Sequence, residues 1–239
     1  MTRPWYIEHP EALAVEATVL DRRPGAVLLD RSPFFPGGGG QLADRGTLAW
    51  SGGTLAFEGV ELDESGLWHR FAGAGEPRGT VLLEVDAGFR NLMCELHTLA
   101  HVLNALVHQA HGGALLTGAQ LSADGTFRVD FDLPGVDSAS LRALEAPMNE
   151  AIRGDLAVGA AYMPRAEAEA IPGMFRSKSV APPPTPDGQV RIVEIAGLDR
   201  QACGGTHLAS TGQARPARIL KVDNKGRQNR RIKVGVGAA

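Results

Sequence analysis

Two short motifs hold residue types that bind transition metals in proteins. His97 and His101 lie four residues apart, and Cys203 lies four residues before His207 in the segment Cys-Gly-Gly-Thr-His. Three imidazoles and one thiolate form a complete tetrahedral ligand set for zinc, and a thiolate among imidazoles favours zinc over other first-row metals. Together the motifs predict one zinc ion held by these four side chains.

Apolar periodicity places the first motif on a helix. At about 100° per residue, one face of this helix is apolar, and His97 and His101 fall nearly opposite it. The apolar face contains Leu92, Leu96, Leu99, Leu103, Leu106 and Ala110. His108 shares the histidine face but lies about 10 Å beyond His101, so we do not expect it to be a ligand. The alternative is an accidental histidine pair, with Cys203 as a small buried hydrophobe.

The composition is that of an ordinary globular protein. Of the 239 residues, 44% are hydrophobic and 21% are charged. No apolar stretch reaches membrane-spanning length, and the first residues lack the apolar segment of a signal peptide, so we expect no membrane partner and a cytoplasmic location. The two cysteines, Cys94 and Cys203, do not suggest a disulfide framework, and we expect no disulfide partner.

The elements that must position these motifs are short strands followed by a mixed region. Strands over residues 15–20, 26–30, 46–50, 54–60, 67–71 and 80–85 predict a small antiparallel barrel. Asp86 is predicted to cap the helix that carries the histidines. We therefore predict an α+β fold with two domains: a β-barrel domain with a glycine-rich loop over residues 1–86, and a zinc-binding domain over residues 87–239.

The second predicted domain mixes strands and helices. Strands are predicted over residues 114–121, 126–131, 156–163 and 190–195, and a helix capped by Ser138 over residues 138–153. Residues 182–188 are too rich in proline for regular structure and predict an exposed loop. Residues 218–222 and 231–236 predict a closing hairpin that turns around Asn224, Lys225 and Gly226.

Four successive glycines, Gly37, Gly38, Gly39 and Gly40, precede Gln41. Ordering four glycines costs much conformational entropy, so an ordinary turn would not need them. They indicate a loop whose backbone approaches a ligand closely, with Gln41 as its polar tip; a floppy barrel loop is the alternative. The loop lacks the Lys and Ser or Thr of a Walker loop, so an ATP-independent activity is expected.

The segment from Arg215 to Lys233 carries eight basic residues and one acidic residue, Asp223. Such a basic hairpin predicts contact with an RNA backbone. Arg230 and Arg231 are the predicted phosphate contacts. The alternative is that one of these two arginines is buried in a structural ion pair. A solvated hairpin with basic decoration is the other reading.

Five segments, taken in order, resemble the freestanding alanyl-tRNA editing proteins, the AlaX family, which are similar to the editing domain of alanyl-tRNA synthetase. They are Phe-Pro-Gly-Gly-Gly-Gly-Gln at 35–41, Leu-His-Thr at 96–98 with His101, Arg-Val-Asp-Phe at 128–131, Cys-Gly-Gly-Thr-His at 203–207 and the hairpin of residues 217–232. The resemblance covers nearly the whole chain. One departure is Glu95, which stands where many members have Gln and affects the expected substrate contacts.

This resemblance implies a small N-terminal β-barrel followed by an α+β editing domain. It implies a translation-fidelity hydrolase that deacylates tRNA(Ala) mischarged with serine, and in some cases with glycine. The zinc ligands of the family correspond to the four side chains named above. The hydroxyl-bearing residue after the first histidine corresponds to Thr98, and the glutamine of the glycine loop to Gln41; both are implied catalytic residues.

The chemistry explains why such a site exists. Serine differs from alanine by one hydroxyl group, which an apolar synthetase pocket cannot reject strongly, whereas a second site that binds this hydroxyl discriminates well. Zinc with Thr98 nearby would provide that site. Four protein ligands would fill the zinc shell, although catalytic zinc usually keeps one position open. No Glu lies between His97 and His101, so the sequence predicts zinc-assisted ester hydrolysis without identifying a general base.

Two other functions fit parts of the sequence. A structural-zinc RNA-binding module without catalytic activity would suit a filled zinc shell and the basic hairpin, but it has no need for the glycine loop. A zinc hydrolase of small esters or amides would suit the ligand set, but the basic hairpin and the barrel argue against it.

Overall fold

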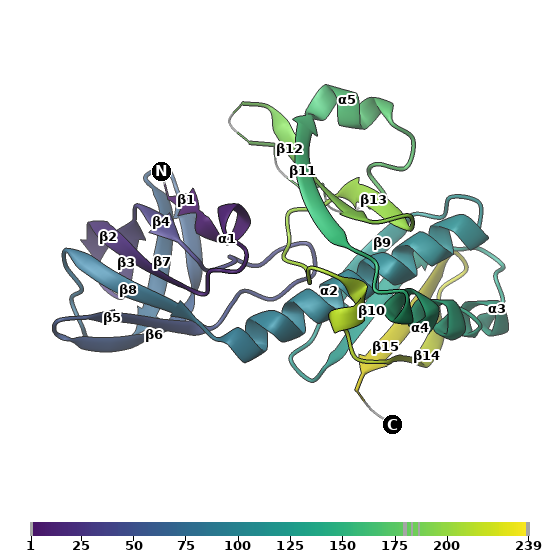
Figure 1. The fold of residues 1–239 in the computed structure, drawn as a ribbon, viewed down its shortest axis with the longest axis horizontal. Helices are drawn as coiled ribbons and strands as arrows, with labels where there is room; N and C mark the ends of the chain where they lie inside the picture. The colour runs from purple at the N-terminus through teal and green to yellow at the C-terminus, as the bar shows by residue number, and fades with distance from the viewer. Residues whose placement is uncertain (1, 179–180, 183, 186, 238–239) are drawn as a thin grey trace. The chain divides into compact units, whose positions relative to one another are not determined.

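The computed structural model describes residues 2–178, 181–182, 184–185 and 187–237. The chain forms two compact units (Figure 1). The first comprises Met1–Gly38 with Leu42–Asn91, and the second comprises Gly39–Gln41 with Leu92–Ala239. The tip of the glycine loop therefore belongs to the unit that contains both predicted metal-binding motifs.

The first unit contains a closed antiparallel barrel in the strand order β2-β3-β7-β6-β5-β8. Its strands are β2 (Ala14–Arg23), β3 (Ala26–Leu29), β5 (Gly46–Trp50), β6 (Gly53–Asp63), β7 (Gly66–Ala72) and β8 (Thr80–Val85). Along β8, exposed and buried residues alternate strictly, as expected for a strand with one face in the core. The stacked rings of Phe34 and Phe57, with centroids 4.1 Å apart, fill part of the interior. The predicted barrel is confirmed.

Three short elements of the first unit were not predicted. They are β1 (Arg3–Pro4), α1 (Trp5–Glu8) and β4 (Arg31–Ser32), and β1 pairs with β4 in parallel. Two to four residues are too few to show a periodic pattern, so the sequence does not mark these elements.

A buried ion pair fixes the base of the glycine loop within the first unit. The Arg90 guanidinium contacts the Asp44 carboxylate, and the two side chains are 5% and 0% exposed. Asp44 also accepts a hydrogen bond from the Phe35 amide, and Arg90 donates one to the Pro33 carbonyl oxygen. Separating this buried ion pair would leave an unpaired charge in the interior, which is energetically costly. The pair and its hydrogen bonds therefore hold both ends of segment 33–44.

The second unit is built around α2 (Ala87–Ala110), which begins in the first unit, and a four-stranded antiparallel sheet. The strands of this sheet, in spatial order, are β14 (Ala217–Lys225), β15 (Asn229–Val236), β10 (Thr126–Asp132) and β9 (Leu116–Leu121). The Asp86 carboxylate accepts a hydrogen bond from the Phe89 amide, which confirms the predicted helix cap. Of the predicted apolar face of α2, Leu96, Leu99 and Leu103 are fully buried, Leu92 and Leu106 are half-buried and Ala110 is exposed, so the prediction of a core face is confirmed for the middle of the helix.

The predicted helix over residues 138–153 is wrong in its continuity. The structure has two helices instead, α3 (Ser138–Arg142) and α4 (Glu145–Arg153). Pro147 has no amide hydrogen for the bond to residue 143, so one uninterrupted helix would lose a bond at this point, whereas proline is tolerated in the first turn of α4. The cap is also one residue earlier than predicted, because the Asp137 carboxylate accepts from the Ala139 and Ser140 amides.

Helix α4 covers the outer edge of the four-stranded sheet. The Asn149 side chain both accepts from and donates to the backbone of Ala217, at 3.0 and 2.8 Å. The Glu145 carboxylate accepts a hydrogen bond from the Ile219 amide. These side chains take the place of a neighbouring strand and satisfy edge groups that would otherwise be open to pairing.

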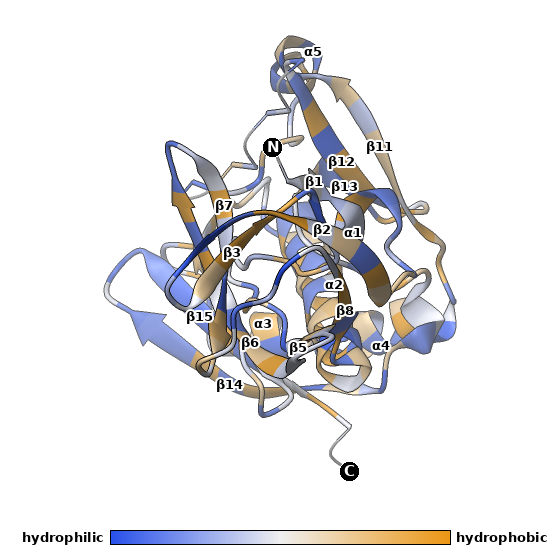
Figure 2. Ribbon diagram, turned by 90° about the vertical axis from the view of Figure 1, so that its left-hand side faces the viewer, coloured by the Kyte–Doolittle hydropathy of each residue, from blue (hydrophilic) through white to orange (hydrophobic). Residues whose placement is uncertain are grey.

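A three-stranded antiparallel sheet carries the second metal-binding motif at its end. It contains β11 (Val158–Pro164), β12 (Gln189–Ile195) and β13 (Asp199–Ala202), accompanied by α5 (Arg165–Ala170) and the 3-10 turn η1 (Thr211–Gln213). Hydrophilic and hydrophobic residues alternate along β12 except at Ile192 and Val193, which are both buried (Figure 2). Of the predicted proline-rich loop, Pro183 and Pro186 lie outside the described residues. Among the described helices, none combines the length and the apolar composition that crossing a membrane requires.

Candidate metal centre

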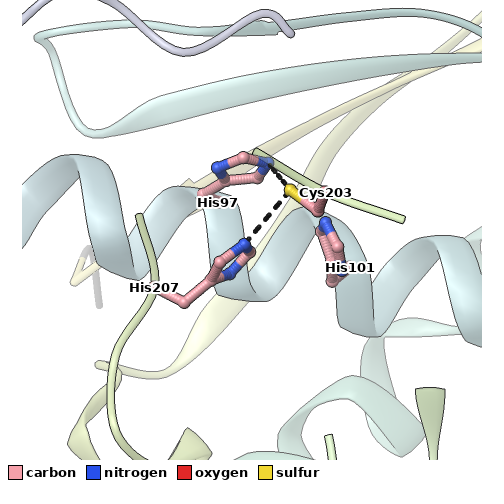
Figure 3. A group of neighbouring side chains, drawn as sticks. All are labelled: His97, His101, Cys203 and His207. Atoms are coloured by element: carbon pink, nitrogen blue, oxygen red, sulfur yellow. Dashed lines mark hydrogen bonds between the residues drawn. The ribbon is translucent and has the colours of Figure 1, made fainter. Parts of the chain in front are cut away.

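The structure brings the four predicted ligands together. His97 and His101 project from α2, and Cys203 and His207 lie in the loop after β13, with the three rings grouped around the Cys203 sulfur (Figure 3). One ligand atom from each of the four residues lies within 4.8 Å of the others. The centroids of the three rings are 4.3 to 5.1 Å apart. The i,i+4 spacing on a helix and the sharp Gly-Gly loop therefore place all four side chains around one point.

These distances and this donor set fit zinc. The Nε2 atoms of His97 and His207 lie 3.6 and 3.4 Å from the Cys203 Sγ atom. In a tetrahedral zinc site, bond lengths of 2.0–2.1 Å to nitrogen and 2.3 Å to sulfur give nitrogen–sulfur edges of about 3.6 Å. The cluster could hold a metal ion without rearrangement of these two contacts.

The electrostatics of the cluster favour a thiolate. Burial raises the pKa of the Cys203 thiol, but the charges of His97, His101 and His207 lower it by more than burial raises it. The net pKa is therefore well below its ordinary value. Burial lowers the pKa of His101, yet the Cys203 and Asp199 charges raise it to about 9. A thiolate beside an imidazolium is thus the metal-free state at neutral pH, and metal binding would displace the imidazolium proton.

The loop that carries Cys203 is shaped by close contacts that sequence reasoning missed. The Arg191 guanidinium of β12 donates to the carbonyl oxygens of Cys203 and Gly205, at 3.0 and 2.9 Å. The Gly205 amide in turn donates to the Cys203 sulfur at 3.4 Å. Nothing in the sequence marks Arg191, because its role depends on the packing of β12 beside the loop.

The glycine loop brings Gln41 to the metal centre. Gly37, Gly38, Gly39 and Gly40 all have positive φ, at 90°, 129°, 61° and 92°. A Cβ on Gly40 would lie 2.6 Å from the Ala119 carbonyl oxygen. Backbone conformation and close approach therefore account for the glycines. Gln41 is buried, with its Oε1 atom 2.8 Å from His97 Nδ1.

Thr98 lies on the same helix, fully buried between the histidines. Its Oγ1 atom accepts a hydrogen bond from the Leu208 amide at 3.1 Å and lies 3.3 Å from His207 Nδ1. Thr98 is thus in contact with one of the four predicted ligands.

A carboxylate that sequence reasoning missed contacts the remaining histidine. Asp199 Oδ2 lies 3.1 Å from His101 Nδ1. Asp199 is itself held by the Arg176 guanidinium, at 2.7 Å, and by the side-chain amide of Gln201, at 2.6 Å. The only sequence signal was the alternation of Asp199 and Gln201 just before Cys203, which becomes informative once β13 is recognised as a strand.

Glu95 contacts Arg215, not the metal cluster. One of its oxygens accepts from the Arg215 amide and the Nε atom, at 2.7 and 3.1 Å, and the other accepts from a terminal guanidinium nitrogen at 2.6 Å. Glu95 is 3% exposed. Its carboxylate therefore ties α2 to the segment before β14, and a charged partner explains the acidic residue at this position.

The two arginines predicted to contact phosphate lie on opposite faces of β15. Arg230 is buried and donates to the carbonyl oxygens of Val136 and Asn229. Arg231 makes two hydrogen bonds of 2.7 Å with Asp130 of β10. Lys233, two residues further, shares the Arg231 face and is exposed.

Comparison with known proteins identifies relatives of this chain. Residues 190–233 match the family model described as "Threonyl and Alanyl tRNA synthetase second additional domain". The chain is 33% identical to the alanyl-tRNA editing protein AlaX-M of Saccharolobus solfataricus, over 97% of this chain and 98% of that protein. It is also 33% identical to AlaX-M of Methanosarcina mazei, over 91% and 89%. An alanine–tRNA ligase of Korarchaeum cryptofilum is 31% identical over 92% of this chain, which spans 24% of that ligase.

Proposed function

Because the chain belongs to the family of alanyl-tRNA editing proteins, we propose that it deacylates tRNA(Ala) mischarged with serine by zinc-assisted ester hydrolysis. Glycine is the second amino acid that the proposal includes. The observation that carries it is the cluster of His97, His101, Cys203 and His207, whose distances and thiolate character suit zinc.

Within the proposal, the chain's own residues hold and orient the reacting groups. The three Nε2 atoms and the Cys203 sulfur would hold zinc, which when bound supplies a Lewis acid next to the ester. His207 is the more exposed of the three histidines, and burial together with the nearby His97 charge lowers its pKa to about 3, so its ring stays neutral at neutral pH. A polar centre of this kind favours a serine hydroxyl over the alanine methyl group.

The proposal is tested by deacylation of three purified substrates: Ser-tRNA(Ala), Gly-tRNA(Ala) and Ala-tRNA(Ala). We expect release of serine, little release of alanine, and loss of both zinc and activity in Cys203→Ala. A wild-type protein that contains zinc and binds tRNA but releases no amino acid would instead be a structural-zinc RNA-binding module. Hydrolysis of small esters or amides without deacylation of tRNA would favour the other alternative, a zinc hydrolase of small molecules.

A further inference from the structure

Each of the three histidines in the metal centre presents Nδ1 to a different buried acceptor. The partners are Gln41 for His97, Asp199 for His101 and Thr98 for His207, at 2.8, 3.1 and 3.3 Å. We propose that these three side chains are positioning residues, which keep each Nδ1 protonated and each Nε2 directed at the metal. Gln41 and Thr98, implied above as catalytic residues, would then act through the ligands. The inference rests on the proposed function only for the identity of the metal.

The orientation of the Gln41 amide follows from its partners. The Thr206 amide can only donate, and it lies 3.1 Å from the atom assigned as Oε1. That atom must therefore be oxygen, and the Nε2 atom on the other side donates to Thr206 Oγ1 at 2.8 Å. His97 Nδ1 faces the same oxygen and must carry a hydrogen to bond with it.

Asp199 leads to the same result for His101. The Asp199 carboxylate faces two groups that can only donate, the Arg176 guanidinium at 2.7 Å and the Gln201 side-chain Nε2 at 2.6 Å, so it acts as an acceptor. His101 Nδ1 must therefore donate to Asp199, which leaves Nε2 for the metal. Carboxylate–histidine pairs of this kind orient ligands in many zinc sites.

Thr98 completes the set for His207. Its oxygen already accepts a hydrogen bond from the Leu208 amide and retains a second lone pair. The His207 Nε2 atom faces the Cys203 sulfur at 3.4 Å, so the hydrogen on a metal-bound His207 is on Nδ1, opposite Thr98. The Thr98 hydroxyl is thus placed to accept it.

This arrangement explains why a loop with four glycines is needed. Gln41 belongs to the second unit together with His97, and the Leu121 amide donates to the Gly40 carbonyl oxygen at 2.8 Å. The loop is therefore fixed along β9 one residue before Gln41. Its conformation delivers one amide oxygen to one imidazole nitrogen, with Thr206 holding both ends of that amide.

The test measures zinc affinity in the full chain without substrate, by competition with a chromophoric chelator. Gln41→Leu and Thr98→Val remove an acceptor with little change in size, and we expect zinc binding to weaken about 10- to 100-fold in each. Gln41→Glu and Thr98→Ser keep an acceptor, so the zinc affinity of these two variants should stay close to that of the wild type. The absorption spectrum of bound Co²⁺ should shift in Gln41→Leu and Thr98→Val. It should match the wild-type spectrum in Gln41→Glu and Thr98→Ser.

Thr211→Val is the matched control. Thr211 is also fully buried in the second unit. Its hydroxyl accepts a hydrogen bond from the Leu156 amide and donates one to the Ala151 carbonyl oxygen, yet it contacts none of the four ligands. Its affinity for zinc should equal that of the wild type. Equal loss in Thr211→Val and Thr98→Val would mean general destabilisation and would overturn the inference.

The outcomes separate this inference from the proposed function. Unchanged zinc affinity in Gln41→Leu and Thr98→Val overturns the positioning role, even if the wild type deacylates Ser-tRNA(Ala). A wild type that binds zinc with the expected pattern of variants but does not deacylate overturns the function and supports the positioning role. Failure of the wild type to bind zinc overturns both.

Discussion

Gly205 shows how closely single residues determine the metal centre. A Cβ built on Gly205 would lie 2.2 Å from the His97 ring and 2.8 Å from Gln41 Oε1. The same construction on Gly204 meets only Pro182, at 3.6 Å, which is an ordinary van der Waals contact. The two glycines of the Cys-Gly-Gly-Thr-His segment therefore have different physical roles, although the sequence does not distinguish them.

Gly205→Ala is expected to lose zinc, because the added methyl group must displace the His97 ring or Gln41. Gly204→Ala, its neighbour and matched control, should retain one zinc per chain. Metal analysis of the two purified variants tests this. Full zinc content in Gly205→Ala would contradict the geometry described for the loop.

His69 provides a prediction for the barrel. It is fully buried, and burial lowers its pKa from 6.5 to about 4. The unfolded chain therefore binds a proton more readily than the folded one between these values. The free energy of unfolding should be highest above pH 6.5 and fall by up to about 3 kcal/mol as the pH decreases to about 4.

His69→Leu should lack this part of the pH dependence. All three tryptophans, Trp5, Trp50 and Trp68, lie in the first unit, so urea unfolding followed by tryptophan fluorescence reports on the barrel. The comparison of wild type and variant between pH 7 and pH 4.5 isolates the contribution of His69 from other acid-titrating groups. Identical pH slopes would show that His69 titrates normally in the folded barrel.

At the scale of elements, the glycine loop and β9 act together. Gly40 packs against the Ala119 backbone, whereas a Cβ on Gly39 would meet nothing within 4 Å. Both residues have positive φ, so alanine at either one carries a similar backbone cost of about 1–2 kcal/mol. Only the substitution at Gly40 also creates a clash with another element.

Gly40→Ala should consequently move the loop away from β9, withdraw Gln41 from His97 and weaken zinc binding about tenfold or more. Gly39→Ala should leave zinc binding nearly unchanged. Chelator competition on the pair separates the clash from the backbone cost they share. Equal affinities would show that the position of Gly40 does not control that of Gln41.

On the scale of the whole molecule, charge is distributed unevenly between the two units. The first unit carries 8 basic and 13 acidic residues, and the second carries 16 basic and 14 acidic residues. The expected RNA contacts therefore belong to the second unit. Along β15 the register places Arg231 and Lys233 on the exposed face, opposite Asp130 and Arg128 of β10, while Arg230 points to the buried face.

Arg231 stays a predicted phosphate contact and the register adds Lys233 to it, whereas the buried Arg230, which donates to backbone carbonyl oxygens, is expected to have a structural role. Arg231→Ala combined with Lys233→Ala should weaken binding of acylated and deacylated tRNA(Ala) alike and reduce the salt slope by about 1 per lost contact. Serine-over-alanine selectivity should not change, because phosphate contacts carry no information about the amino acid.

Arg230→Ala is the comparison variant for this experiment. It removes hydrogen bonds to two backbone carbonyl oxygens. Its main effect should therefore be a lower melting temperature, with little change in the salt slope of tRNA binding. A salt titration of tRNA binding with all three proteins tests both statements. An unchanged slope in the Arg231 and Lys233 double variant would assign this face of the hairpin to solvent.

Local patterns in the sequence were sufficient for several features. The 3.6-residue period predicted α2 with its leucine and histidine faces, because helix geometry alone determines which side chains share a side. The strands of the barrel and the closing hairpin follow from two-residue alternation between turn residues. The types and spacing of His97, His101, Cys203 and His207 were enough to predict one metal cluster, since both motifs are short-range.

Contacts between distant segments were decided only by the tertiary structure. Asp199 and Arg191 act on the metal centre through the pairing of β12 with β13, and Glu95 meets Arg215 across 120 positions of sequence. Sequence reasoning assigned Gln41 and Thr98 to the site, but not to the ring nitrogens that they face. Hydrogen-bond partners depend on strand register and loop conformation to within an ångström, and no local pattern of residue types encodes that.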